Sequence, residues 1–364
     1  MQNNIHVLHI VEAFAAGTLT AVSQICHALN NGYVHSILHS VRSETPSNFK
    51  DLFPANCSFY YMQMEREILP IRDLKTFLTL ISKIKAINPD IVHCHSSKAG
   101  ALGRAAAWFC GLPSVYTPHS YSFLQTNYSP FKRKIFRAGE WLGTRFGTAI
   151  AACGEHEFRL ARELGGKDYI VFSIPNYINL KMMDSVTPEY IDSDLPAIGI
   201  SGRYSPQRQP TLFCSIAENV KHLCTSIWIG ADPELFADKP YIHATGWLDR
   251  DRAQNLLAGL DIYVQTSSWE GLSYSVIEAM ALGVPVVATR IPANQELVVH
   301  GETGFLGETS QELSEYITIL LKDKALRTKM GQAGRKKIEK YHDSAVVFKK
   351  YAELYSLIAN SRQS

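Results

Sequence analysis

Short apolar runs alternate with longer amphipathic runs along most of this sequence, and that alternation restricts the fold more than any other feature. Apolar runs of about four to eight residues are typical of buried strands, and longer runs with a 3.6-residue period are typical of helices. The predicted strands of the first half are residues 5–11, 33–40, 90–95, 114–119 and 148–153, and the predicted helices are residues 19–30, 73–88, 98–111 and 131–146. Strand and helix in alternation predict parallel βαβ units.

The alternation stops in residues 178–196, which are polar and contain two prolines, and then starts again. The later predicted strands are residues 196–202, 226–230, 241–246, 261–267 and 284–289, followed by a helical region from about 310 to 360. A polar, proline-containing break between two such series predicts an interdomain linker. We therefore predict an α/β fold with two Rossmann-like, doubly wound domains that face each other across a cleft. Ligands of such sheets bind at the carboxyl ends of the strands.

Composition excludes several classes of function. The formal net charge of +2 over 364 residues gives no support for nucleic-acid binding by charge. The seven cysteines form no C-x-x-C pair, which favours a reduced, cytoplasmic protein. MQNNIHVLHI has no secretory pattern, and no uncharged apolar run is long enough to predict a membrane-spanning helix.

The stretch SSWEGLSYSVIEAM places two carboxylates around a predicted strand-to-helix turn. Glu270 follows the strand 261–267, Gly271 is expected to give the turn its freedom, and the helix is expected to begin near Ser273. The N–H groups of Leu272 and Ser273 would then be available to bind an anion.

Glu278 shares a helix face with Tyr274 and Ser275 at i, i+3 and i+4 spacing. Carboxylates accept hydrogen bonds from paired hydroxyls, so a phosphate between Glu270 and Glu278 would suit a sugar nucleotide. The alternative is that Glu278 pairs with an arginine and Glu270 lies in solvent.

A phosphate at a helix start needs more stabilisation than the helix dipole supplies, because the dipole contributes only about 0.3–1 kcal/mol. A cation at about 4 Å adds roughly 4 kcal/mol at an effective dielectric near 20. The segment IGISGRYSPQR offers Gly202, Arg203 and Arg208 directly after a predicted strand. The alternative for both arginines is a solvated loop.

GRYSPQR followed by EGLSYSVIE resembles the retaining glycosyltransferases of the GT-B fold that carry two glutamates separated by seven residues. VEAFAAGTLTAV, DIVHCHSSKAG and YTPHSYSF resemble the bacterial polysaccharide and O-antigen branch of that group, glycosyltransferase family four. The resemblance implies an acceptor-side domain in residues 1–180, a linker in 181–196, a donor domain in 197–342, and a helix in 343–364 that returns to the first domain.

The resemblance also implies roles for individual residues. Arg203 and Arg208 would hold the donor diphosphate, although the family usually has lysine where Arg208 stands, and arginine differs in geometry. Glu270 would contact donor-sugar hydroxyls, Glu278 the ribose, and His119 the donor sugar. Gly17 would allow a close approach to the phosphates.

The activity implied by the resemblance is retaining transfer from a nucleotide-diphosphate sugar, with UDP as the expected nucleotide, and we expect it to be metal-independent because Arg203 and Arg208 could neutralise the leaving group. The acceptor would be a saccharide, in particular one linked to undecaprenyl diphosphate. We predict no cofactor and no essential metal. A sugar-nucleotide epimerase of the same fold and a two-lobed sugar-binding protein are the alternatives.

Four further features each allow a structural and a functional interpretation. Trp247 would contact the nucleobase or pack internally, and Lys98 would meet an anionic acceptor or simply begin a close-packed helix. The basic, aromatic segment 128–147 would lie on an anionic membrane surface or form a solvated helix face. His93 and His95 share a strand face, but the sequence indicates no third metal ligand, so core histidines are favoured.

Overall fold

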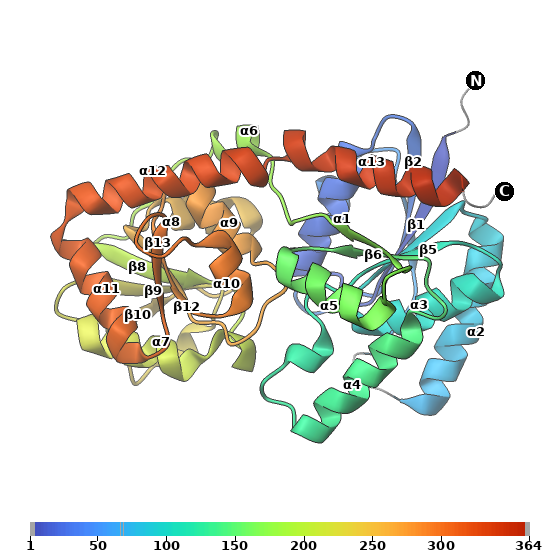
Figure 1. Cartoon of the computed structure of the whole chain (residues 1–364). Helices are drawn as coiled ribbons and strands as arrows, with labels where there is room; N and C mark the ends of the chain where they lie inside the picture. Colours follow the sequence, from blue (N-terminus) through green and yellow to red (C-terminus); the bar gives the residue numbers. More distant parts are fainter. Residues whose placement is uncertain (1–3, 66, 68, 361–364) are drawn as a thin grey trace. The chain divides into compact units, whose positions relative to one another are not determined.

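The computed structural model describes residues 4–65, 67 and 69–360, which form two compact units (Figure 1). The first unit contains Met1–Asn176 and Val347–Ser364, and the second contains Tyr177–Val346. Each unit is a parallel sheet with helices between successive strands, so the predicted pair of Rossmann-like α/β domains is confirmed.

The first unit has a seven-stranded sheet with the order β3-β2-β1-β4-β5-β6-β7. Its strands are β1 Ile5–Val11, β2 Tyr33–His39, β3 Ser58–Tyr61, β4 Ile91–His95, β5 Ser114–Thr117, β6 Ala149–Ala152 and β7 Ile170–Ser173. Its helices are α1 Ala16–Ala28, α2 Pro70–Ile87, α3 Ser97–Phe109, α4 Pro130–Gly143, α5 Glu155–Gly165 and most of α13, Ser344–Asn360. The strand order reverses direction between β1 and β4.

The second unit has a six-stranded sheet with the order β10-β9-β8-β11-β12-β13. Its strands are β8 Ala197–Ser201, β9 Thr225–Ile229, β10 Ile242–Ala244, β11 Ile262–Gln265, β12 Val286–Thr289 and β13 Gly304–Gly307. Its helices are α6 Leu180–Met183, α7 Pro210–Val220, α8 Arg250–Ala258, α9 Tyr274–Ala281, α10 Pro292–Leu297, α11 Ser310–Lys322 and α12 Lys324–Tyr341. The order of this sheet reverses between β8 and β11.

The central strands read as continuous apolar runs because both of their faces are covered. Every residue from Val7 to Val11 is buried, and so are all residues of β12. Strands of parallel sheets show this pattern because helices cover both sides of the sheet.

Local signals explain where several helices begin and end. Pro70 stands at the first position of α2, where its missing N–H costs no hydrogen bond, and Asn88 ends that helix in the left-handed conformation. Asp249 accepts from the backbone N–H of Arg252 and caps α8, which begins at Arg250.

The sequence left three elements of the first unit unassigned: β3, α5 and β7. The two strands lie at the edges of the sheet, are four residues long, and are only partly buried, so their apolar signal is weak. Residues 181–196, the predicted linker, begin inside α6 and belong to the second unit. In the described part of the chain, no helix combines the length and hydrophobicity that crossing a membrane requires.

Candidate functional site

The candidate site of the second unit lies where the strand order reverses, at the carboxyl ends of β8 and β11. Gly202 directly follows β8, and Glu270 follows β11 by five residues. Doubly wound sheets bind ligands at this position because the loops from the two strands diverge there. The two segments that the sequence singled out therefore meet at one point of the sheet.

Arg208 is fixed between these two loops. Its Nη1 donates to Oε1 of Gln265 at 2.6 Å and lies 3.5 Å from Oε1 of Glu270. A Cβ on Gly202 would lie 2.9 Å from Nη2 of Arg208, and Gly202 has φ of 131°. Both the close approach and the backbone conformation therefore require glycine at position 202.

Glu270 is held by several hydrogen bonds and is not a solvated side chain. Its Oε2 accepts from Nε2 of Gln207 at 2.9 Å, and its Oε1 accepts from Oγ of Ser267 at 2.9 Å. The amide of Gln265 donates to the same Oε1 at 3.3 Å. Sequence reasoning missed Gln265, although a glutamine at the end of an apolar strand was the available signal, and the residue is fully buried.

The helix start beside Glu270 is confirmed at the position that the sequence predicted. Ser273 directly precedes α9, is buried, and accepts a hydrogen bond from Nε2 of Gln265 at 3.0 Å. Leu272 is also buried. The proposed freedom of Gly271 is not used, because Gly271 is not among the residues with positive φ.

Glu278 lies on α9 and is engaged from α8. Its Oε1 accepts from Nε2 of Gln254 at 2.8 Å and lies 3.5 Å from Nη2 of Arg250. The pairing with an arginine matches the alternative interpretation of this glutamate. All of these interactions go through Oε1, and Oε2 makes no hydrogen bond or ion pair within the described residues, so the pairing leaves one carboxylate oxygen for a ligand.

The remaining predicted residues lie in different settings. Arg203 is exposed in the loop after β8, and Trp247 is 50% exposed after β10. Lys98 pairs with Asp73 of α2 at 2.6 Å. Gly17 lies inside the first turn of α1, and the residue with positive φ at that turn is Ala16.

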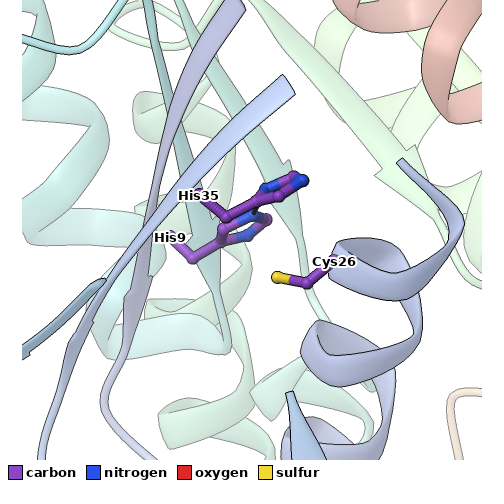
Figure 2. A group of neighbouring side chains, drawn as sticks. All are labelled: His9, Cys26 and His35. Atoms are coloured by element: carbon purple, nitrogen blue, oxygen red, sulfur yellow. Dashed lines mark hydrogen bonds between the residues drawn. The ribbon is translucent and has the colours of Figure 1, made fainter. Parts of the chain in front are cut away.

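The first unit contains a cluster of buried histidines at the reversal point of its own sheet. Figure 2 shows His9 of β1 and His35 of β2 side by side, with the sulfur of Cys26 on α1 facing them. His9 also approaches His93 and His95 of β4, and one ligand atom from each of these three lies within 4.8 Å of the others. His93 and His95 are fully buried, as the favoured interpretation predicts, and the sequence did not indicate His9 as their neighbour.

Burial controls the protonation of these rings. Desolvation, followed by the repulsion of neighbouring histidines, lowers the pKa of His9, His93 and His95 well below the ordinary value. Burial also lowers the pKa of His35 and of His119 to about 4. The cluster is therefore neutral at pH 7.

Helix α4 carries an exposed apolar and basic face. Its inner side is anchored by the buried ion pair of Arg104 with Glu140, at 2.8 Å. Four large apolar residues point outward with exposures of 74, 53, 49 and 51%: Phe131, Ile135, Trp141 and Leu142. Lys132 and Lys134 are exposed on the same helix, whereas Arg137 pairs with Glu163 of α5.

Two family models match this chain. Residues 6–176 match the glycosyl transferase 4-like domain, and residues 239–337 match the glycosyl transferases group 1 domain. Among curated proteins, the chain is 28% identical over 293 residues to an Escherichia coli enzyme, UDP-Gal:alpha-D-GlcNAc-diphosphoundecaprenol alpha-1,3-galactosyltransferase, covering 73% of this chain and 74% of the relative.

Solved structures share the fold over almost the whole chain. Sucrose-phosphate synthase from Thermosynechococcus elongatus aligns with a TM-score of 0.79 at 17% identity, covering 98% of this chain and 100% of that one. HepE from Anabaena in complex with UDP-glucose aligns with a TM-score of 0.77 at 18% identity, covering 97% and 99%. At these identities the likeness shows the fold alone.

Proposed function

The chain is a glycosyltransferase with the GT-B fold, and we propose that it transfers a sugar from a UDP-sugar to a saccharide linked to undecaprenyl diphosphate, with retention of anomeric configuration. The name of the Escherichia coli relative supports both the UDP-sugar donor and the lipid-linked acceptor. We place the reaction in the synthesis of a bacterial surface polysaccharide. The capsular polysaccharide glycosyltransferase CapM of Staphylococcus aureus, 25% identical over 330 residues, supports that setting.

The observation that carries the proposal is the contact network around Arg208 at the reversal point of the second sheet. The guanidinium is held by Gln265 and Glu270, and the loop that carries it begins at Gly202. A cation fixed in this way stabilises negative charge at low reorganisation cost, because its position is set before the reaction. We assign it to the donor diphosphate, where charge develops as the sugar leaves.

The two glutamates suit the hydroxyl-bearing parts of the donor. Glu270 has its orientation fixed by Gln207, Gln265 and Ser267, so its carboxylate can distinguish the hydroxyls of one sugar from those of another. We assign Glu270 to the donor sugar and the available Oε2 of Glu278 to the ribose. Arg203 and the backbone at Leu272 and Ser273 are assigned to the phosphates.

We further propose that no essential metal takes part. The diphosphate would be neutralised by Arg203 and Arg208, so the departing charge needs no divalent ion. Among the described residues, the candidate metal groups consist of the buried residues of the first unit: His9, Cys26, His35, His93 and His95. These residues are buried, and their hydrogen bonds go to one another and to other groups of the first unit, whereas the proposed diphosphate site belongs to the second unit.

The lipid-linked acceptor implies that the enzyme works at an anionic membrane surface, and we assign α4 to that contact. Phe131 and Ile135 offer apolar side chains, and Lys132 and Lys134 offer positive charge. An amphipathic helix of this composition can lie in the interface of a bilayer. Arg137 contributes less, because it already pairs with Glu163.

The test is a donor screen followed by a transfer assay. UDP-, GDP- and dTDP-sugars are compared by thermal shift, because a ligand at 100 times its Kd stabilises by about 2.7 kcal/mol. The selected donor is then incubated with GlcNAc-diphosphoundecaprenol, and the product linkage is read by proton NMR. An α product from an α donor supports the proposal. Epimerised nucleotide sugar formed without acceptor would instead make the chain an epimerase, and no stabilisation by any nucleotide sugar would refute the donor site.

A further inference from the structure

Four histidines of the first unit form one continuous hydrogen-bonded chain across the sheet. Nδ1 of His35 lies 3.1 Å from Nε2 of His9, and Nδ1 of His9 lies 3.1 Å from Nε2 of His95. Nδ1 of His95 in turn lies 3.0 Å from Nε2 of His119. The chain thus runs from β2 through β1 and β4 to the residue that follows β5 by two positions.

One end of this chain has a fixed polarity. Nε2 of His35 lies 3.4 Å from the backbone oxygen of Leu29, and a carbonyl oxygen can only accept. Nε2 of His35 therefore carries the hydrogen. A neutral imidazole has only one N–H, so Nδ1 of His35 must be an acceptor, and Nε2 of His9 must donate to it.

The same reasoning continues to the other end. Because Nε2 of His9 carries its hydrogen, Nδ1 of His9 accepts from Nε2 of His95, and Nδ1 of His95 accepts from Nε2 of His119. Nδ1 of His119 is then left with a lone pair. No described residue has a recorded hydrogen bond to that atom, and His119 is partly exposed.

The backbone around His119 supports a functional constraint at this position. His119 has φ of 52° and Ser120 has φ of 84°, a conformation that non-glycine residues seldom adopt. The backbone N–H of Ser120 donates to Oε1 of the buried Glu157 at 2.8 Å. Such conformations persist where surrounding contacts hold them, and they concentrate at active sites.

We propose that His35, His9 and His95 are positioning residues that hold His119 in its Nε2–H tautomer, so that Nδ1 of His119 accepts a hydrogen bond from a saccharide hydroxyl. The assignment of the hydroxyl rests on the proposed function. The chain does not relay protons, because the Leu29 carbonyl at its far end cannot take one up. Its role is to determine which nitrogen of the His119 ring accepts a hydrogen bond and which nitrogen donates one.

A metal ion is the competing occupant of this cluster. His9, His93 and His95 approach closely enough to bind one, and a bound ion would replace the hydrogen at a nitrogen of His9 or His95. The contacts of His93 favour the hydrogen-bonded chain, because its two nitrogens already meet the hydroxyls of Tyr355, at 2.7 Å, and Thr117, at 2.9 Å.

Nitrogen-15 NMR of histidine-labelled protein tests the tautomer without any substrate, so its result is independent of the proposed function. The expected spectrum at pH 7 gives His119 an unprotonated Nδ1 and a protonated Nε2, unchanged by EDTA. His35→Phe removes the acceptor at the far end, which allows the whole chain to reverse and moves hydrogen onto Nδ1 of His119. His93→Gln is the matched control, because His93 is equally buried on β4 but lies outside the chain.

A protonated Nδ1 of His119 in the unaltered protein overturns the proposal. One zinc ion per protein molecule, bound at the nitrogens of His9 or His95, also overturns it. A His35→Phe spectrum identical to that of the control would also overturn it. If His35→Phe does not fold, the wild-type spectrum still decides.

Kinetics then tests the consequence for catalysis. With UDP-galactose as the donor probe, His95→Leu should lower kcat by about 10- to 100-fold with a smaller effect on KM, since the ring of His119 loses its acceptor. His95→Asn places an amide oxygen near the position of Nδ1 of His95 and should restore kcat to within about threefold. If His95→Leu and His95→Asn both fold and lose kcat equally, His95 acts only through packing, and its positioning role is overturned.

Discussion

Replacing Arg208 with alanine should separate catalysis from stability in this protein. The guanidinium lies 3.5 Å from Oε1 of Glu270, with side-chain exposures of 17% and 11%. At an effective dielectric near 20, one charge pair at this distance interacts by about 5 kcal/mol before desolvation is subtracted. A developing phosphate charge at a similar distance would feel a comparable attraction.

Arg208→Ala is expected to lower kcat/KM strongly and the stability of the folded protein only slightly. Loss of one fixed donor to a transition-state oxyanion typically costs about 2.7–4 kcal/mol, so kcat/KM should fall about 100- to 1,000-fold. Glu270 keeps its hydrogen bonds from Gln207, Gln265 and Ser267, so the folded protein should lose only about 1–2 kcal/mol. For a unit of this size the loss lowers Tm by a few degrees.

The assay is release of the nucleotide from the sugar nucleotide that the donor screen selects, in the presence of the lipid-linked acceptor, beside thermal unfolding of each variant. Arg252→Ala is the matched control, because Arg252 belongs to the same unit and its ion pair with Glu189, at 3.2 Å, is 59% exposed on the arginine side. Arg208→Lys should give an intermediate rate, since lysine keeps the charge without the planar fork. An Arg208→Ala enzyme within threefold of the wild-type rate would refute the assignment.

Three further predictions concern metal, membrane and pH. Turnover should survive EDTA, and loss of turnover that Mg²⁺ or Mn²⁺ restores would contradict a diphosphate site without a metal ion. Sedimentation with anionic vesicles should fall when Phe131 and Ile135 become serine, and should weaken with salt because each basic residue contributes about 1 kcal/mol at the surface; Leu78→Ser on α2, 58% exposed, is the control. Stability should fall as pH drops from 6.5 towards 4, because burial lowers the pKa of His35 to about 4 and the unfolded chain therefore binds the proton first. Each pKa unit corresponds to about 1.4 kcal/mol, so unfolding temperatures that do not change over this range would contradict the buried, neutral histidines.

The sequence by itself determined the central strands of both sheets, the fold class and the helix start beside Glu270. Those features depend on local pattern: apolar runs become strands that helices cover on both faces, and a strand followed by a short polar turn predicts the next helix start. It also placed Arg208 and Glu270 at strand ends, which was enough to predict that they meet once the sheet order is known. The edge strands β3, β7 and β13 were not predicted. For β3 and β7 the reason is that a half-exposed strand of four residues carries little hydrophobic signal, and β13 contains two glycines among its four residues.

Only the tertiary structure decided what each polar side chain contacts. No local pattern indicates that Gln265 joins Arg208 to Glu270, or that Arg250 contacts one oxygen of Glu278, because those partners come from separate elements. The histidine chain shows the same limit more strongly. His35, His9, His95 and His119 lie on four different segments, and parallel pairing of β2, β1, β4 and β5 brings them into line. A pattern along the chain records which residues are buried, but the order of strands in the sheet determines which buried residues become neighbours.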